Sequence, residues 1–250
     1  PLPPLPEQKK IAEILSTWDT AISKLGTLIS KYELRKKALM QKLLTGKVRF
    51  KEFEGHEWKS VRLKEALKMV PRPVDKPDKP YTALSLRSHG KGAFLRDVKE
   101  PAEVMMGTLY QVKENDLIVN ITFAWEGAIT ILRQEHEQGL VSHRFPTYEF
   151  NTDIALPEYF RQLVLTKYFV HNLILISPGG AGRNRVLNKK DFMKLKIDLP
   201  TVEEQQKIAS VLTAQDIQID LLKKQKANLE QQKKGLMQKL LTGEIRVKTD

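Results

Sequence analysis

The sequence lacks several features that would each indicate a particular class of protein. It contains no cysteine, which excludes disulfide bonds and thiolate metal sites. No two of its five histidines lie at the spacing of a zinc site, and no apolar run reaches the roughly 18 residues that cross a bilayer. We therefore predict a soluble, cytoplasmic protein with no membrane contact, metal or cofactor. The first residues, PLPPLPEQKK, contain no starting methionine and no signal peptide, so we expect either a chain cut from a longer one or one from which a tag was removed.

Motifs of known catalytic sites are also missing. No P-loop, dinucleotide fingerprint or nucleophile elbow occurs, and a zinc-deaminase signature would need cysteine. Residues 120–123 (NITF) lack the prolines of the amino-methyltransferase tetrad. Glu57 and Lys59 have the E-x-K spacing of many nucleases, but such short patterns recur by chance. We predict no catalytic residue, and a Mg²⁺-dependent nuclease that uses Glu57 and Lys59 is kept as an alternative.

Basic residues are in clear excess. The 250 residues include 42 Lys and Arg against 30 Asp and Glu, a formal charge of +12. An excess of this size favours a polyanionic partner such as nucleic acid. A solvated basic surface would give the same charge, so charge alone does not decide between these interpretations.

An internal duplication organises the chain. Residues 2–50 align without a gap on residues 199–247, an offset of 197, with 23 identities in 49 positions. A clear identical stretch is MQKLLTG, at residues 40–46 and again at 237–243. We therefore divide the chain into a first copy (1–50), a middle domain (51–198) and a second copy (199–250).

Each copy predicts one long helix, over residues 7–45 and 202–242. Apolar residues recur at alternating intervals of three and four, which is the seam of a coiled coil. The seam comprises Ile11, Leu15, Trp18, Ile22 and Leu25 in the first copy, and Ile208, Leu212, Ile219 and Leu222 in the second. Because both helices meet the middle domain, we expect them to pack on each other in antiparallel orientation as a spacer.

The ends of the helices and the interruptions of the seam are recognisable. Thr201 and Glu204 match a capping box, and Gly46 and Gly243 suit the left-handed position after a helix. We expect β-structure in the tails at 47–50 and 244–247. Four polar residues interrupt the seam, namely Lys36, Gln215, Lys226 and Lys233. They either fix the alignment of the helices or are solvated, and the sequence leaves both possibilities open.

The middle domain predicts a different structure. Short β-type runs at 81–87, 116–121, 128–132 and 144–150 alternate with turns. One helix is expected within 157–176. The predicted fold class is therefore α+β, with one mixed domain flanked by two long helices in an antiparallel coiled coil.

Three loops of this domain combine glycine or serine with basic side chains. Arginine can contact guanine through a bidentate fork and asparagine can contact adenine, while glycine lets the backbone approach phosphates closely. The candidate DNA contacts are Gly180, Gly182, Arg183, Asn184 and Arg185 in one loop, Ser88, His89 and Lys91 in a second, and His143 and Arg144 in a third. We favour DNA contact for the first loop, and the other two are left open. We interpret Trp125 as a packing residue.

The whole arrangement resembles the specificity subunit of Type I restriction–modification systems. The resemblance is carried by LPEQKKIA at 5–12 and QKLLTG at 41–46, and by their second copies within 199–209 and 238–243. Within the domain, residues 116–120, 124–127 and the stretch with Asn188, Asp191 and Phe192 also look like that family. The family alternates two recognition domains with two such helices, whereas this sequence has one domain, so it resembles a half or truncated subunit.

The resemblance implies a function and partners. A subunit of this family recognises part of a split site in double-stranded DNA, and its helices separate the parts and bind methyltransferase (modification) subunits, which a restriction subunit joins. It does no chemistry itself and uses no cofactor. A half-subunit would pair as a homodimer to present two domains. A coiled-coil adaptor whose middle domain binds protein rather than DNA is the second alternative, beside the nuclease.

Overall fold

The computed structural model describes residues 2–179 and 185–248 and divides into two compact units. One unit contains the chain up to Leu39 and from Val211 onward, and the other contains Met40–Ser210. Among the described residues, no helix is both long and apolar enough to span a membrane. Each unit is described separately below, and the class is α+β.

Two long helices dominate the first unit. Helix α1 runs over Leu5–Leu43 and α6 over Val202–Thr242, 39 and 41 residues respectively, or about 60 Å each at 1.5 Å per residue. The hydroxyl oxygen of Thr201 accepts a hydrogen bond from the Glu204 amide (3.4 Å) at the start of α6. Gly46 and Gly243 have φ of 68° and 79°, so each helix ends at a left-handed glycine, as predicted.

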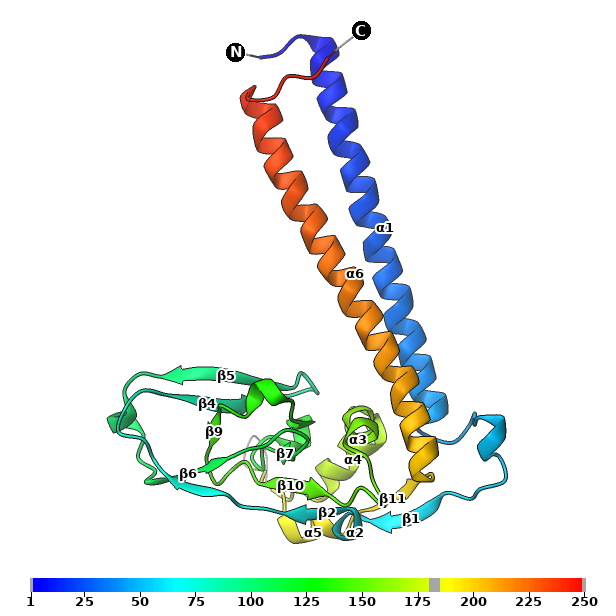
Figure 1. The fold of residues 1–250 in the computed structure, drawn as a ribbon, viewed down its shortest axis with the longest axis vertical. Helices are drawn as coiled ribbons and strands as arrows, with labels where there is room; N and C mark the ends of the chain where they lie inside the picture. Colours follow the sequence, from blue (N-terminus) through cyan, green and yellow to red (C-terminus); the bar gives the residue numbers. More distant parts are fainter. Residues whose placement is uncertain (1, 180–184, 249–250) are drawn as a thin grey trace. The chain divides into compact units, whose positions relative to one another are not determined.

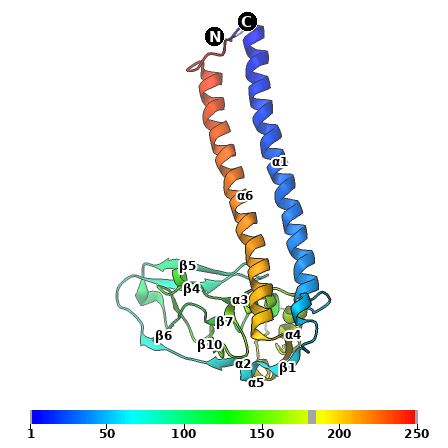
Figure 2. The same cartoon turned by 45° about the vertical axis from the view of Figure 1, so that its right-hand side comes forward.

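The two helices lie side by side in antiparallel orientation (Figures 1 and 2). Lys36 on α1 bonds to Asp216 on α6 at 2.6 Å, and Lys233 on α6 bonds to Asp19 on α1 at 2.5 Å. Both lysines are among the residues that interrupt the apolar seam. Each of them pairs with an aspartate on the opposite helix. Of the predicted seam residues, five are buried and four are half-buried: Ile11, Ile208, Leu212, Ile219 and Leu222, then Leu15, Trp18, Ile22 and Leu25.

The tails after the two helices are not strands, so the expectation of β-structure at 47–50 and 244–247 is wrong. Each tail instead bonds back to its own helix, with the Val48 amide donating to the Lys42 carbonyl and the Ile245 amide to the Lys239 carbonyl. A β-type run of four residues needs a neighbouring strand to pair with, and neither tail has one among the described residues.

Over its described residues, the second unit contains three sheets (Figure 1). A two-stranded sheet pairs β1 (Lys59–Arg62) with β11 (Lys196–Leu199), and a four-stranded sheet has the order β2-β10-β7-β8. A five-stranded sheet has the order β3-β6-β9-β4-β5, in which only the β4–β9 pair is parallel. The remaining strands are β2 (Leu67–Met69), β3 (Pro73–Asp75), β4 (Tyr81–Leu86), β5 (Ala93–Val98), β6 (Thr108–Gln111), β7 (Leu117–Val119), β8 (Ile129–Ile131), β9 (Leu140–Val141) and β10 (Thr147–Phe150).

Helices complete the second unit. They are α2 (Leu63–Ala66), α3 (Pro157–Leu163), α4 (Lys167–Leu175) and α5 (Lys189–Lys194), with 3-10 turns η1 (Lys51–Phe53), η2 (Pro101–Glu103), η3 (Ala124–Glu126) and η4 (Gln134–His136). The single helix expected within 157–176 is wrong, because two helices occur there. Thr166 lies between them, and its hydroxyl oxygen accepts from the Phe169 amide at 3.2 Å. A side-chain cap of this kind starts a new helix.

The core of the second unit contains side chains from both larger sheets. Leu84, Val112, Ile118, Leu132 and Val141 form one buried cluster. An ion pair at the edge of this core joins the two sheets: Arg72, just before β3, donates to both carboxylate oxygens of Asp116, at 2.6 and 3.1 Å, just before β7. The hydrogen bond to Asp116 raises the pKa of Arg72 above its ordinary value.

The start of α6 is anchored in the second unit by a buried carboxylate. Arg49 donates to Glu204 through two nitrogens, Nε at 3.0 Å and Nη2 at 2.5 Å, and the Trp58 indole donates at 3.3 Å. The bond to Glu204 raises the pKa of Arg49. These hydrogen bonds from Arg49 and Trp58 satisfy the Glu204 carboxylate, whose charge would be costly to bury without a partner.

Gln205, the next residue, is fully buried and connects the helix to the domain. Its amide nitrogen donates to the carbonyls of Ile154 (2.8 Å) and Pro200 (3.0 Å), and its amide oxygen accepts from the Leu156 amide (2.9 Å). The carboxamide thus makes three hydrogen bonds that hold the 154–156 loop against the first turn of α6.

Candidate nucleic-acid interface

One short segment organises the loops that carry the predicted DNA contacts. The segment at residues 120–127 leaves β7, forms the turn η3 and enters β8. Asn120 stabilises this turn through two hydrogen bonds. Its side-chain oxygen accepts from the Thr122 backbone amide (3.0 Å), and its backbone amide donates to the Ala128 carbonyl (2.9 Å). Gly127 closes the turn at φ 76°. We call residues 120–127 the hub segment.

The first loop attached to the hub segment contains Ser88, His89 and Lys91. The Ser88 hydroxyl donates to the Glu126 carboxylate at 2.6 Å, and the His89 amide donates to the Glu126 carbonyl at 2.7 Å. His89 has a left-handed φ of 61°, which is uncommon outside glycine. The imidazole and the Lys91 ammonium are exposed, so the loop is fixed through its backbone and presents its basic groups to solvent.

The second loop contains His143 and Arg144. The Ile121 amide donates to the Arg144 carbonyl at 3.0 Å, and the Arg144 guanidinium donates to the Thr122 hydroxyl at 3.2 Å. The Ser142 hydroxyl oxygen accepts from the Arg144 amide at 3.3 Å. Both His143 and Arg144 are exposed, and Arg144 keeps further guanidinium donors for a ligand.

The third loop returns to the hub segment after the glycine-rich stretch. The Leu187 amide donates to the Ile121 carbonyl at 2.8 Å, and the Arg185 guanidinium lies 5.6 Å from the centre of the Trp125 ring. The Trp125 indole donates to the Thr122 carbonyl at 3.1 Å, so the ring is held in place as a platform for Arg185. The other predicted contacts of this loop, Gly180, Gly182, Arg183 and Asn184, lie outside the described residues.

The hub segment therefore brings together residues that are about 100 positions apart in the sequence. Ser88, His89, Arg144 and Arg185 all belong to loops that it contacts directly. Glu126 is the carboxylate of the segment, and it is engaged by Ser88. Arginine forks and imidazoles on fixed loops can contact phosphates and base edges. Sequence reasoning missed the role of the hub segment, because its contacts are long-range backbone hydrogen bonds that leave no local pattern.

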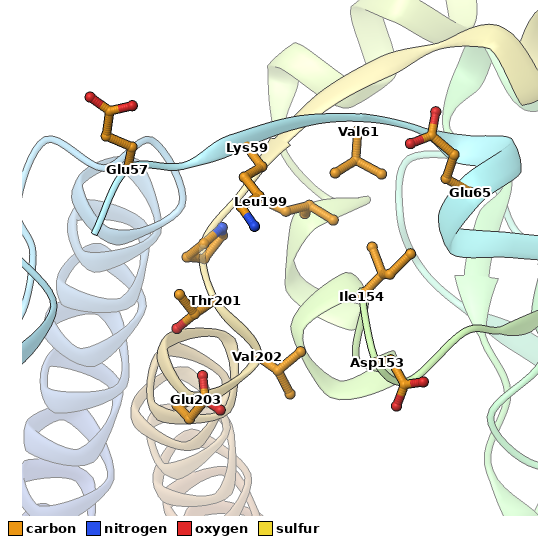
Figure 3. A pocket seen from close by; sticks show the side chains of 11 residues that line it. Glu57, Lys59, Val61, Glu65, Asp153, Ile154, Leu199, Thr201, Val202 and Glu203 are labelled. Atoms are coloured by element: carbon orange, nitrogen blue, oxygen red, sulfur yellow. The ribbon is translucent and has the colours of Figure 1, made fainter.

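A hollow of about 490 Å³ at the start of the domain contains the residues of the nuclease alternative. Glu57 and Lys59 line it, together with Glu65, Asp153 and Glu203. Figure 3 shows the carboxylates of Glu57 and Glu65 pointing away from that of Asp153. Over residues 2–179 and 185–248, no three His, Asp or Glu side chains are grouped as metal ligands. This geometry gives a Mg²⁺-dependent nuclease no support.

Comparison with known families identifies the chain's relatives. Residues 56–231, more than half of the chain, match the family described as Type I restriction modification DNA specificity domain. The chain belongs to this family. The resemblance found in the duplicated helices is thus confirmed, and the family of the chain is that of the specificity subunits.

Two specificity subunits of Methanocaldococcus jannaschii are among the similar proteins. The MjaVIII subunit of a Type I restriction enzyme is 29% identical over 99% of this chain and 62% of its own length. The putative MjaX subunit is 30% identical over 100% of this chain and 60% of its own length. The chain therefore spans less than two thirds of the specificity subunits that it matches.

Solved specificity subunits share the fold. The HsdS subunit from Thermoanaerobacter tengcongensis is 18% identical with a TM-score of 0.53, covering 98% of this chain and 60% of that one. The S subunit from M. genitalium is 16% identical with a TM-score of 0.56, covering 94% and 60%. At these identities the likeness concerns the fold, and it agrees with a sheet-rich domain between two long helices.

Proposed function

We propose that this chain recognises a specific base sequence in double-stranded DNA as a specificity subunit, with residues 51–198 as its recognition domain. One observation supports this most directly: the hub segment contacts three loops that carry basic groups, of which His89, Lys91, His143 and Arg144 are exposed and Arg185 is half-buried. Arg144 and Arg185 are the described side chains best suited to a bidentate contact with guanine. His89, Lys91 and His143 are assigned to phosphates and base edges beside them, with Ser88 positioning the loop.

The experiment for this function compares substitutions in a binding assay with duplex DNA. A selection from random duplexes first gives the preferred sequence. Arg144→Ala and Arg185→Ala are each expected to weaken binding to that sequence by about 1–3 kcal/mol if the residue contacts a base, and to relax the preference at one position. Arg96→Ala, which removes an exposed charge from β5, is the control. Equal effects of all three on preferred and random DNA would contradict base recognition by Arg144 and Arg185.

We propose that the chain has no catalytic role of its own and that partner subunits carry out methylation and cleavage. The relatives are named specificity subunits of restriction enzymes, and one solved relative is described in terms of complex assembly of a Type I system. The helices at 1–50 and 199–250 would then space the DNA-binding parts and bind methyltransferase subunits, which the restriction subunit joins. Co-purification with a methyltransferase subunit tests this, and the adaptor alternative predicts such binding without DNA affinity.

We further propose that two copies of the chain form a homodimer through the end of the helix pair that contains Glu7 and Arg246. This end is called the free end, and the end that contains Arg49 and Glu204 is called the anchored end. The duplication supplies the argument. At the anchored end, Leu199 and Leu44 are 2% and 6% exposed, whereas their duplicates Leu2 and Leu241 are 90% and 66% exposed. A leucine pair that is covered at one end and open at the other suits a second recognition domain, here that of another copy.

The polar residues at the two ends support the same proposal. Glu7 and Arg246 form the same ion pair as Glu204 and Arg49. The side chain of Gln8 donates to the Pro3 carbonyl at 2.7 Å, as Gln205 donates to its own proline. Gln8 is exposed, so its remaining capacity suits the loop of a second domain.

Sedimentation over a range of concentrations tests the homodimer. Leu241→Lys places a charge in the open leucine pair and is expected to shift the chain to monomer. Leu221→Lys changes another exposed leucine of α6, 55% exposed against 66% for Leu241 and away from this end, and is the control. A wild-type chain that stays monomeric at every concentration would contradict the homodimer, while DNA recognition by a single domain would still stand.

A further inference from the structure

We propose that a hollow between α4 and the His89 loop binds the sugar–phosphate backbone of DNA beside the base-contacting loops. The inference rests on the proposed function and adds a second contact region to it. The hollow measures about 950 Å³ and is open to solvent. Its rim carries His89, Lys167, Tyr168 and His171, of which only His89 was a predicted DNA contact.

Helix α4 presents three of these side chains on one face. Phe169 and Leu173 are buried and fix the inner face of the helix. Lys167, Tyr168 and His171 therefore point outward, at positions i, i+1 and i+4 of the same turn and the next. All three are exposed, and Tyr168 is 59% exposed, which is high for an aromatic residue in a folded domain.

The opposite wall of the hollow is the backbone of the first basic loop. The Gly90 amide donates to the Gly127 carbonyl at 3.1 Å. A Cβ at Gly90 would lie 2.8 Å from the end of the Leu165 side chain in the turn between α3 and α4, so the loop packs closely against this turn. The left-handed backbone of His89 is held by the bonds of the His89 and Gly90 amides to the Glu126 and Gly127 carbonyls. Strain that the surroundings impose in this way is often found where a ligand binds.

The charge and polarity of the hollow match a deoxyribose–phosphate chain. Lys167 supplies a full positive charge and the two imidazoles supply further donors. The hollow also contains the Glu126 carboxylate, which accepts a hydrogen bond from the Ser88 hydroxyl. The floor is apolar, with Val164, Val170 and Ile174, which suits a sugar. Continuity with the DNA-contacting loop through His89 favours nucleic acid over an acidic segment of a partner protein.

The experiment uses the full chain and a random-sequence duplex, because phosphate contacts are independent of sequence. Affinity is measured from roughly 50 to roughly 200 mM salt. Lys167→Ala is expected to weaken binding uniformly across sequences and to reduce the slope of log affinity against log salt by about 1. Tyr168→Ala and His171→Ala are expected to weaken binding without changing the preferred sequence. Lys99→Ala, which removes an exposed charge after β5, is the matched control.

The outcomes separate this inference from the function on which it rests. If wild type binds DNA and Lys167→Ala has the same salt slope and affinity as Lys99→Ala, the hollow is not a backbone site, although recognition by Arg144 and Arg185 stands. If Lys167→Ala keeps DNA affinity but loses a partner subunit, the hollow is a protein-binding surface and the inference is wrong. If wild type shows no salt-dependent affinity for duplex DNA, the inference and the proposed function are both wrong.

Discussion

Arg49 contacts Glu204 through the same two-point ion pair by which Arg246 contacts Glu7. In each pair the arginine Nε and Nη2 atoms bond to the two carboxylate oxygens, at 3.0 and 2.5 Å in the first and at 2.7 and 2.6 Å in the second. The offset of 197 residues relates all four positions. The duplication has therefore preserved a contact between the copies, because each pair takes its glutamate from one copy and its arginine from the other.

This relationship gives a stability prediction with an internal control. Arg49→Met is expected to lower the free energy of unfolding by about 3 kcal/mol, because it leaves the buried Glu204 carboxylate without its charged partner. Arg246→Met removes the duplicate contact and also leaves a buried carboxylate, Glu7, but the Arg246 side chain is 63% exposed against 16% for Arg49, so its effect is expected to be smaller. Urea unfolding of both variants measures the difference, and equal losses would contradict this account of the anchored end.

Gln205 and Gln8 form a second pair of duplicates with different surroundings. Gln205→Leu is expected to destabilise the chain by about 2 kcal/mol, since the Leu156 amide and Ile154 carbonyl lose a buried partner. Gln8→Leu is expected to leave the unfolding of the monomer almost unchanged because Gln8 is exposed. Thermal unfolding at low protein concentration compares the two variants. A Gln205 variant as stable as the Gln8 variant would mean that the 154–156 loop is held by other contacts.

Alanine substitutions at Gly90 and Gly92 distinguish the stability cost of a left-handed backbone from the cost of a steric contact. Both have left-handed φ angles, 66° and 77°, but a Cβ at Gly90 meets Leu165 whereas a Cβ at Gly92 meets nothing within 4 Å. Gly92→Ala is expected to cost about 1–2 kcal/mol from the backbone alone. Gly90→Ala is expected to cost somewhat more, because the Leu165 side chain must also shift. Chemical denaturation of both variants measures this, and equal costs would contradict a steric contribution from Leu165.

The free end of the helix pair is expected to weaken in acid. The hydrogen bond from Arg246 holds the pKa of Glu7 below its ordinary value of 4.5. A carboxylate with a lowered pKa stabilises the folded state above the ordinary value, and this contribution is lost as the pH falls through the lower one. Melting curves between about pH 7 and about pH 3 are expected to show less acid loss for Glu7→Gln than for wild type. Identical pH dependence in both proteins would contradict a stabilising role for the pair.

Local features of the sequence predicted the helical parts of the fold well. The heptad spacing of Ile219 and Leu222, the cap at Thr201 and the glycines at 46 and 243 each act within a few residues of the chain, so a sequence pattern reveals them. The break at Thr166 was missed because the apolar pattern continues across it into α4. Lys36 was left undecided between a solvated and an aligning residue, since its partner Asp216 lies on the other helix.

The candidate interface was predicted in part. The basic loops around His89, Arg144 and Arg185 were recognised from their composition. Their convergence on the hub segment was not, because the bonds of Ile121 to Arg144 and Leu187 join distant parts of the chain. The contribution of α4 was missed for a related reason: Lys167 is a single basic residue on a short helix, and only its position opposite the His89 loop gives it significance.

We propose above all that this chain recognises a base sequence in duplex DNA through the loops on the hub segment. Selection of bound sequences from a random duplex library, with wild type and with the Arg144→Ala, Arg185→Ala double variant, tests it most directly. The account predicts that wild type enriches one defined motif and that the double variant loses or broadens it. A wild-type chain that enriches no sequence, or a double variant that enriches the same motif as strongly, would contradict the account.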